Sequence, residues 1–273
     1  MNWKVTLGLM CVVGGGAWLM RDQLPACKEW VKEKIPQKTI PSLEAHYTAE
    51  QIIETHKKEL LKNNSYSFLQ PQLTFYPHAL MHIKYAKDDA TTEEGLSLWS
   101  LSDGEMVIDA VTWEKTHGLE DCLKAKAEAS DFLLVHALAG YELGLPRQQV
   151  EQITQLQEDV LDKVIEACER KKLIVHSKGF LRLHFAKPCF AKTPLTKFQE
   201  EFACTSIKST QKEAKHYSTS QIKSLAERAF GPAFSVRQIE EVFVPVYVIA
   251  VQNPDGSTLV THWNAINGKR MRG

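Results

Sequence analysis

The sequence has no excess of charge of either sign. Its 273 residues include 33 lysines and arginines and 33 aspartates and glutamates, so the formal net charge is zero. A chain that binds nucleic acid or an anionic membrane surface usually carries a basic excess, because phosphate groups attract cations over long distances. The balance excludes attraction by the chain as a whole, so any such attraction must come from a local group of basic side chains.

Paired cysteines are also absent. No two of the six cysteines form a CxxC motif or another spacing typical of a metal site. They are Cys11, Cys27, Cys122, Cys168, Cys189 and Cys204. Several fall in apolar helical patterns, so we expect buried free thiols, which favour a reducing compartment.

No catalytic signature is present. The chain contains no G-x-S-x-G motif, no phosphate-binding glycine loop, no H-E-x-x-H motif and no dinucleotide fingerprint. Cys122 with His117, and Cys204 with His216, are close in sequence, but linear proximity does not establish the geometry of a nucleophile and its base. We therefore predict that the protein is not an enzyme and has no cofactor.

Two pairs of histidines invite a metal-site interpretation. His78 and His82 are four residues apart on an expected strand and would share a face, while His176 and His184 lie on the two strands of an expected hairpin. Neither pair has a third ligand at a useful spacing. We expect packing or surface roles for these side chains and predict no metal site.

An uncharged apolar run extends from Val5 to Met20. As a helix its 16 residues would span about 24 Å, which is short of the roughly 30 Å hydrocarbon core of a bilayer. We expect residues 1–20 to form a single-pass membrane anchor. The residues assigned to this anchor are Val5, Leu9, Val12 and Trp18.

Two alternatives to an anchor remain open. Gly15 and Ala17 are small enough for recognition by signal peptidase, so the run could be a cleaved signal and the body would then be exported. A lipoprotein modified at Cys11 is disfavoured, because Met10 occupies the position that needs a small residue.

Basic residues follow the apolar run, and residues 21–45 read as a stalk, in which "IPQKTIPSLEAH" carries two prolines and little periodic pattern. The basic residues are Arg21, Lys28, Lys32, Lys34 and Lys38. A basic flank prefers the cytoplasmic side, so we expect the body to face the cytoplasm. A short N-terminal tail that stays inside would instead export the body.

Residues 46–118 and 215–273 are expected to form two α+β modules that resemble each other. Each begins with a helix and a capping box, in which a hydroxyl side chain is followed three residues later by glutamine. The capping pairs are Thr48 with Gln51 and Ser218 with Gln221. The pattern predicts a diverged internal repeat of one helix packed on a small antiparallel sheet, with chance resemblance of two ordinary modules as the alternative.

Strands and turns follow each helix. Each module has a proline in its strands, Pro77 and Pro245, which should mark a strand start, an edge or a bulge. The matched turn signals are Asp103-Gly104 with Asp255-Gly256, and the matched strand ends are Trp113 to Gly118 with Trp263 to Gly268. The second module weakly resembles PepSY-like helix-plus-sheet modules in "VYVIAVQNPDGSTLVTHW", which implies at most a binding or inhibitory role.

Residues 119–187, between the modules, resemble winged helix-turn-helix domains, and residues 188–214 read as a linker. Pro146 suits a helix start, the third helix is expected from about Glu158 to Lys171, and "LIVH" and "FLRLHF" should form a hairpin wing around Ser177-Lys178-Gly179. A generic three-helix module with a hairpin is the alternative. Many members of the winged-helix family enter the DNA major groove.

The charges of this segment argue against DNA binding. The expected outward face of the third helix is rich in acids, which would repel phosphates. These acids, assigned as partner-binding residues, are Glu158, Asp159, Asp162, Glu166 and Glu169. A nucleic-acid site would instead use the wing and its approach. Its residues would be Lys171, Lys172, Lys178 and Arg182.

The sequence therefore predicts an α+β protein: an N-terminal membrane segment, a helix-plus-sheet module, a central winged-helix-like domain and a second helix-plus-sheet module. The expected function is that of a membrane-anchored interaction or adaptor protein with a protein partner. Nucleic acid is not expected as a partner, and small molecules are left open. The alternatives are a membrane-tethered nucleic-acid regulator and an exported binding or inhibitor protein.

Overall fold

The computed structural model describes residues 39–61, 65–87, 91–198, 204–208 and 211–271. Residues from Ile40 onward form one compact unit, of mixed α+β architecture. The expected anchor residues Val5, Leu9, Val12 and Trp18 lie outside the described ranges. In the described part of the chain, no helix is long and apolar enough to cross a membrane.

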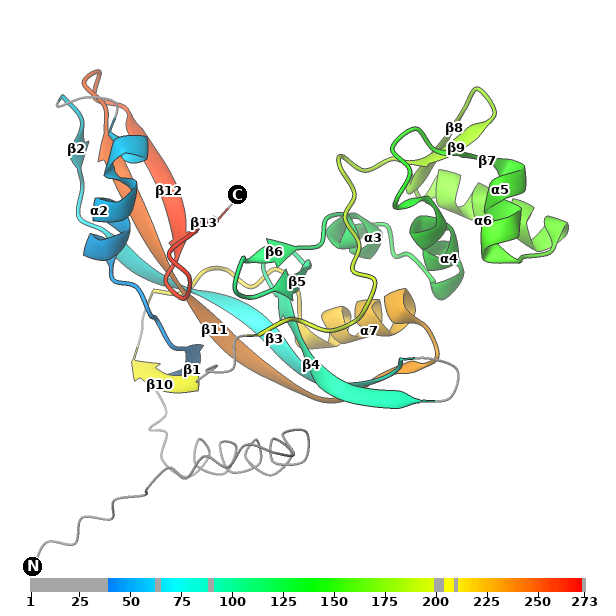
Figure 1. Ribbon diagram of the computed structural model, residues 1–273, viewed down its shortest axis with the longest axis horizontal. Coiled ribbons are helices and arrows are strands. Elements are labelled where there is room, and N and C mark those ends of the chain that lie inside the picture. The colour runs from blue at the N-terminus through cyan, green and yellow to red at the C-terminus, as the bar shows by residue number, and fades with distance from the viewer. Residues whose placement is uncertain (1–38, 62–64, 88–90, 199–203, 209–210, 272–273) are drawn as a thin grey trace, which may run out of the picture. The chain divides into compact units, whose positions relative to one another are not determined.

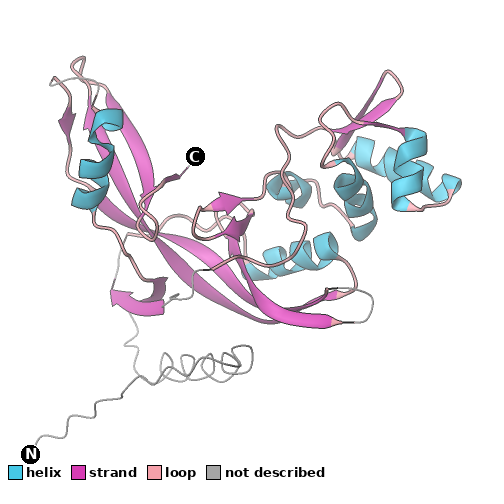
Figure 2. Ribbon diagram, in the orientation of Figure 1, coloured by secondary structure: helices cyan, strands magenta, loops and turns pink. Residues whose placement is uncertain are grey.

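The described residues form six helices and two sheets (Figures 1 and 2). The helices are α2 (Ala49–Leu60), α3 (Leu119–Lys124), α4 (Ala129–Leu138), α5 (Arg147–Thr154), α6 (Glu158–Arg170) and α7 (Thr219–Phe230). The larger sheet contains β1 (Thr39–Leu43), β2 (Ser67–Phe68), β3 (Gln72–Ala86), β4 (Thr92–Ser100), β5 (Met106–Asp109), β6 (Glu114–Lys115), β10 (Cys204–Lys208), β11 (Phe234–Gln252), β12 (Thr258–Asn264) and β13 (Arg270–Met271). The smaller contains β7 (Leu145–Pro146), β8 (Ile174–Ser177) and β9 (Phe180–Leu183).

Helices α2 and α7 begin by the same chemistry and are both 12 residues long. Both expected capping boxes are confirmed, because the Thr48 and Ser218 hydroxyls accept from the backbone N–H of Gln51 and Gln221, whose side chains accept in return. Each box satisfies two N–H groups that a helix start leaves unpaired.

The long strands β3 and β11 pair antiparallel around a symmetric centre. Phe75 lies opposite Pro245, Tyr76 opposite Val244, and Pro77 opposite Phe243, so a Phe-x-Pro segment pairs with its own counterpart. A parallel neighbour flanks each strand at its Phe: Ser42 pairs with Phe243, and Lys212 with Phe75. These reciprocal pairs relate the two repeats by a local two-fold axis at the middle of the sheet.

The two repeats exchange their helices across this axis (Figure 1). The residues that lead into α2, His46 and Tyr47, donate their backbone N–H groups to the Ala265 carbonyl of the second repeat, both at 2.9 Å. The residues that lead into α7 do the same in reverse, because His216 and Tyr217 donate to the Leu101 carbonyl at 3.0 and 2.9 Å. Each helix therefore contacts the hairpin of the other repeat. Helix α7 also packs on β11 of its own module, as expected, because the Phe230 and Phe234 rings lie 5.3 Å apart.

The two prolines explain why these carbonyls are available. The Pro77 carbonyl accepts from Leu101 N–H at 2.9 Å, and the Pro245 carbonyl accepts from Ala265 N–H at 3.0 Å. The N and O of one strand residue point to the same side, so a residue with an N–H at 77 or 245 would donate back to the carbonyl of Leu101 or Ala265. Proline has no N–H. Each proline lies inside a long strand and leaves that carbonyl free for the incoming helix segment.

Each exchanged helix packs on a buried tryptophan. Trp263 is fully buried and lies with Ile52 and Leu60 of α2, while Trp99 is fully buried in the cluster that contains Leu225 of α7. The indole N–H of Trp263 donates to the Thr261 hydroxyl and that of Trp99 to the Ser97 hydroxyl, both at 2.8 Å. The two sites therefore repeat the same side-chain chemistry.

The predicted correspondence between the two repeats is wrong by one hairpin. Trp99, not Trp113, corresponds to Trp263, because Leu98 pairs with Val107 as His262 pairs with Met271. Asp103-Gly104 correspondingly matches Asn267-Gly268, whereas Asp255-Gly256 forms the turn between β11 and β12. The sequence does not separate the two possibilities, because Trp99, Trp113 and Trp263 each lie five residues before a glycine.

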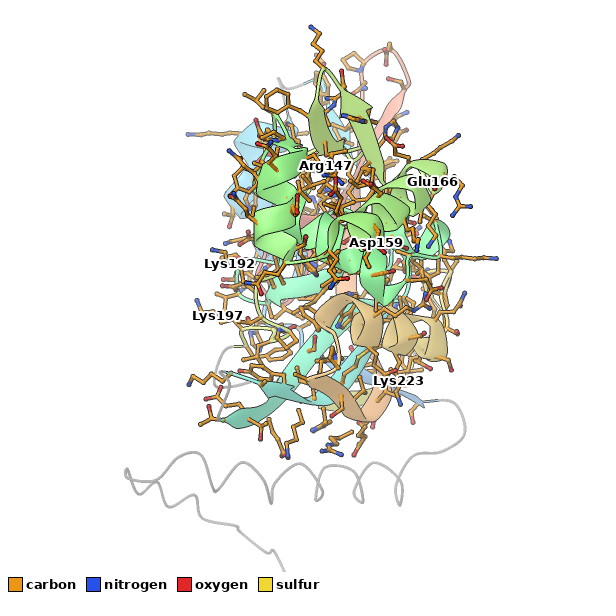
Figure 3. All side chains as sticks on the ribbon, turned by 90° about the vertical axis from the view of Figure 1, so that its right-hand side faces the viewer. Arg147, Asp159, Glu166, Lys192, Lys197 and Lys223 are labelled. Carbon is orange, nitrogen blue, oxygen red and sulfur yellow. The ribbon has the colours of Figure 1, made fainter. Side chains whose placement is uncertain are left out.

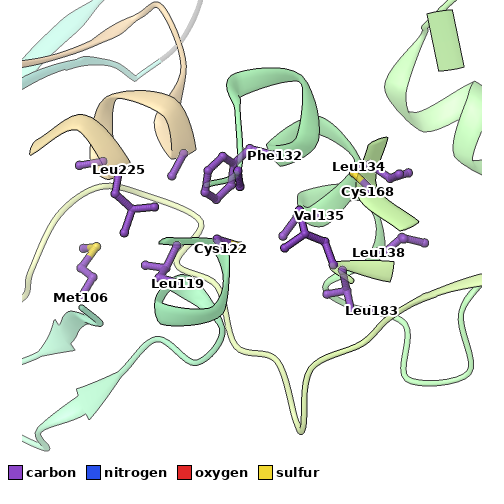
Figure 4. Close-up of a cluster of buried hydrophobic side chains, with 14 of the residues drawn as sticks. Met106, Leu119, Cys122, Phe132, Leu134, Val135, Leu138, Cys168, Leu183 and Leu225 are labelled. Carbon is purple, nitrogen blue, oxygen red and sulfur yellow. The ribbon is translucent and has the colours of Figure 1, made fainter. Parts of the chain in front are cut away.

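The segment between the repeats is joined to the sheet by a buried carboxylate and by continuous apolar packing. Glu105 accepts from Gly118 and Glu120 N–H at 2.9 and 3.0 Å, at the start of α3, and from the Thr116 hydroxyl at 2.6 Å. A carboxylate at a helix N-terminus opposes the positive end of the helix dipole. Figure 4 shows the apolar cluster running from Leu225 on α7 through α3 to α4.

We predict that Gly268→Ala destabilises the fold more than Gly256→Ala. Both glycines have positive φ, so both substitutions should cost about 1 kcal/mol from backbone strain. A Cβ at Gly268 would also lie 3.0 Å from the Tyr47 ring of the other repeat, whereas nothing lies within 4 Å of one at Gly256. Urea unfolding of both variants measures the difference, and equal losses would contradict the contact.

Candidate interaction surfaces

Helix α6 presents an acidic face to solvent. The five assigned acids, Glu158, Asp159, Asp162, Glu166 and Glu169, are all exposed, whereas Leu161, Val164 and Cys168 are buried. The outward position of the acids follows from helical periodicity, because the apolar positions occupy one stripe that faces the core. Figure 3 labels Asp159 and Glu166 on this side of the molecule.

Arg147 at the start of α5 neutralises part of this face. Its guanidinium donates to Asp162 at 2.8 Å and lies 3.4 Å from Glu158. Asp159, Glu166 and Glu169 make no ion pair with any described residue. The uncompensated negative charge is therefore concentrated on these three side chains.

Exposed apolar side chains gather on the same segment. Six of the ten large hydrophobic residues that the structure describes as exposed lie between residues 129 and 183. They are Leu133, Tyr141, Leu143, Ile153, Val160 and Phe180. Leu143 is the most exposed of them, at 89%, and a shallow pocket on α5, lined by Gln148, Glu151, Gln152, Gln155 and Leu156, adds a concave feature of about 450 Å³. Apolar groups next to charged ones are typical of protein contact surfaces.

The basic residues on and before the β8–β9 hairpin form a smaller exposed group than the sequence predicts. Lys172, Lys178 and Arg182 are exposed, but Lys171 forms an ion pair with Asp131, whose side chain is only 2% exposed. Asp131 also accepts from Glu128 N–H at 2.7 Å and from the Cys168 thiol at 3.5 Å. Lys171 therefore neutralises a buried carboxylate instead of adding to the exposed basic group, and no sequence pattern points to its partner Asp131.

Four described cysteines are free, and two of them are buried. Burial, with the neighbouring Asp131, raises the pKa of Cys168 to about 12, and burial also raises the pKa of Cys122. A thiol with a raised pKa carries little thiolate and is a poor nucleophile. Cys122 and its sequence neighbour His117 therefore do not form an activated pair, because Cys122 is buried and His117 is exposed.

The expected histidine pairs are placed as follows. His78 and His82 both lie on β3, His78 buried and His82 half-buried, and His176 and His184 lie exposed at β8 and just after β9. His216 is exposed, and its ring contacts the Ser102 carbonyl at 2.7 Å. Among the described residues, no three histidine, cysteine or carboxylate side chains gather as a metal ion would need.

His78 is a buried polar residue with one satisfied nitrogen. Its Nδ1 donates to the Tyr76 carbonyl at 3.0 Å, which leaves Nε2 as an acceptor, and Nε2 has no partner among the residues that the structure describes. The indole N–H of Trp113 is also buried without a partner among them, and its ring lies edge-on to His78 with centroids 5.8 Å apart. Burial, with the nearby Lys115 ammonium, lowers the pKa of His78 to about 4.

Comparison of the chain with family models, with curated proteins and with solved structures gives no match.

We predict that Lys171→Met destabilises the protein by roughly 2–3 kcal/mol, because it leaves the Asp131 carboxylate buried without its cation. The matched control is Lys172→Met, which removes an exposed charge and should change stability by less than about 0.5 kcal/mol. Equal effects in thermal or urea unfolding would show that the Asp131 pair contributes nothing.

We also predict that acid destabilises the protein through His78. The unfolded chain binds a proton near the ordinary pKa of 6.5, whereas folded His78 stays neutral until about pH 4, so stability falls between these values. The loss at pH 5 relative to pH 7 should be about 2 kcal/mol.

The control for this prediction is His78→Gln, which keeps a donor for the Tyr76 carbonyl but cannot titrate. Its unfolding free energy should change less between pH 7 and pH 5 than that of the original chain. The same pH dependence in both proteins would assign the acid sensitivity to other groups.

Proposed function

We propose that this protein is a membrane-anchored, non-enzymatic adaptor whose segment 119–187 contains a winged-helix-like domain that binds another protein. The observation that carries the proposal is the surface of this segment, where the uncompensated acids Asp159, Glu166 and Glu169 lie on the same helix as the exposed Val160. A partner with a basic surface around apolar side chains would complement it.

The order of elements supports the winged-helix interpretation. The segment runs α4, β7, α5, α6, β8 and β9, with β7 and β8 on either side of β9. The β8–β9 connection is a two-residue turn in which Lys178 and Gly179 have φ of 53° and 82°, the left-handed pair that suits a tight hairpin. Fold alone does not decide function, so the charges of the segment must.

Those charges favour a protein over DNA. In a DNA-binding winged helix, the exposed side of the third helix faces the groove, and here it exposes five acids with only Lys163 and Arg170 as bases. Lys172, Lys178 and Arg182 could contact phosphates but are too few to offset the acids. The nucleic-acid regulator is therefore the weaker proposal.

The proposed membrane anchor is the apolar run at residues 5–20, and the proposal places the body of the protein on the cytoplasmic side. The second candidate is an exported binding or inhibitor protein. The second repeat favours it, because its capped helix followed by "VYVIAVQNPDGSTLVTHW" weakly resembles PepSY-like modules. Intact mass of the mature chain, with protease accessibility in sealed vesicles, separates the two candidates.

The binding surface is tested with a charge-reversal variant. A partner protein should co-purify with the full chain from solubilised membranes. The triple variant Asp159→Lys, Glu166→Lys, Glu169→Lys should no longer bind it, because the variant reverses the charge of the exposed acidic face of α6. The control makes the same change in charge at three exposed acids elsewhere: Glu44→Lys, Glu54→Lys, Glu94→Lys. Loss in both variants, or in neither, would contradict the assignment of the site to α6.

A further inference from the structure

The outer edge of β4 in the first repeat is covered by an extended segment of the chain. Thr196 N–H donates to the Leu96 carbonyl at 2.9 Å, and the Thr196 hydroxyl accepts from Leu98 N–H at 2.8 Å and donates to the Val107 carbonyl at 2.6 Å. The side chain of Leu195 fills the space above Gly95, where an added Cβ would lie 2.3 Å from Leu195 Cδ2. This segment has no regular strand of its own.

The matching edge in the second repeat is β12. The register that relates Trp99 to Trp263 also relates Leu96 to Val260, Leu98 to His262 and Gly95 to Leu259. Strand β12 pairs with β11 along its length, and with β13 only at His262 and Trp263. Among the residues described, no segment lies on the other side of β12 between Thr258 and Thr261.

This edge has none of the usual protection against strand pairing. Exposed edges of soluble proteins are commonly blocked by charged side chains, proline or a bulge. Residues 257–261 are Ser-Thr-Leu-Val-Thr, and their pairing with β11 is regular from Thr258. Leu259 and Val260 are 44% and 47% exposed. By contrast, the outer part of β11 carries a register shift next to Arg237.

We propose that the Thr258–Thr261 edge of β12 is a binding site for an extended peptide segment of a partner protein, which adds to the sheet as the 194–197 segment adds to β4. The peptide runs antiparallel to β12, because residues 196–197 run parallel to β5, and β5 is antiparallel to β4. Main-chain hydrogen bonds supply the affinity of such strand addition, and alternate side chains supply the specificity.

A partner peptide suits this edge better than a second copy of the chain. A stable interface between two folded proteins usually buries more than about 1,000 Å², which an edge of four residues does not provide by itself. A single extended segment needs only main-chain partners along its own length. Residues 196–197 illustrate this, because Thr196 N–H donates to the Leu96 carbonyl of β4, and Lys197 pairs on its other side with Ile108 and Ala110 at the end of β5.

The side chains at the edges of β4 and β12 predict which residue types the bound peptide contains. A threonine or serine in the place of Thr196 bridges the edge through its hydroxyl, as it does to Leu98 N–H. The preceding residue must be small, because Leu259 stands where Gly95 makes room for Leu195 in the first repeat. The site therefore selects a small residue followed by a hydroxyl residue.

The test uses two fluorescent peptides and the full chain in detergent. One peptide has the sequence of residues 192–198, Lys-Thr-Pro-Leu-Thr-Lys-Phe, and the other has alanine in place of leucine. The alanine peptide should bind saturably and about five-fold more tightly than the leucine peptide, since Leu259 excludes the larger side chain. In Leu259→Gly, which recreates the geometry of Gly95, the preference should reverse.

Val260→Lys should weaken binding of the alanine peptide about ten-fold, because it places a charge on the edge. The control Val160→Lys changes an exposed valine of α6 and should leave peptide binding unchanged. Because Val160 lies on α6, this control also separates the β12 site from the proposed partner-binding surface of α6. If the proposal for α6 is wrong, the expected peptide binding at β12 stays the same. Both lysine variants and Leu259→Gly are checked for folding by thermal unfolding.

Absence of saturable binding by the alanine peptide would overturn the proposal, as would equal binding to the Val260→Lys variant. Concentration-dependent dimers of the full chain that Val260→Lys abolishes would also overturn it, because the edge would then belong to a second copy.

Discussion

Two backbone carbonyls, those of Leu101 and Ala265, connect the two repeats of this fold. Each accepts two N–H groups from the segment that leads into the other repeat's helix. A proline in the adjacent strand makes this possible, because Pro77 and Pro245 have no backbone N–H that could donate a hydrogen bond to these carbonyls. Each helix then covers the tryptophan of the opposite repeat, so neither repeat buries its own core alone. The result is one sheet in which both halves depend on each other.

This dependence explains where surfaces for binding are left. The exchanged helices and the buried Glu105 tie the central segment to the sheet, so that α6 presents its acids from a fixed support. Because the two repeats have matching strands, a difference between matching edges shows where a binding surface is exposed. One sheet edge is covered by residues 194–197, whereas the described structure has no cover on the other. The two surfaces lie on different elements of the fold, α6 and β12.

Local features of this fold could be predicted from the sequence, and long-range ones could not. Capping residues such as Thr48 and Ser218 act within one helical turn, and the acids of α6 were placed outward by periodicity alone. The exchange of helices depends on hydrogen bonds between residues as far apart as His46 and Ala265, which no local pattern encodes. The spacing from tryptophan to glycine is the same at Trp113 and at Trp99. Only the pairing of the strands shows that Trp99 is the counterpart of Trp263. The role of Lys171 was likewise hidden, because its partner Asp131 lies 40 residues away.

The exchange is tested most directly by proton–proton contacts measured by nuclear magnetic resonance. The His56 ring of α2 lies 4.4 Å from the Trp263 ring, and the Phe230 ring of α7 lies 6.4 Å from the Trp99 ring. The account predicts nuclear Overhauser effects from His56 to Trp263 and from Phe230 to Trp99. Contacts from His56 to Trp99 and from Phe230 to Trp263 would show that each helix packs on its own repeat, and would contradict it.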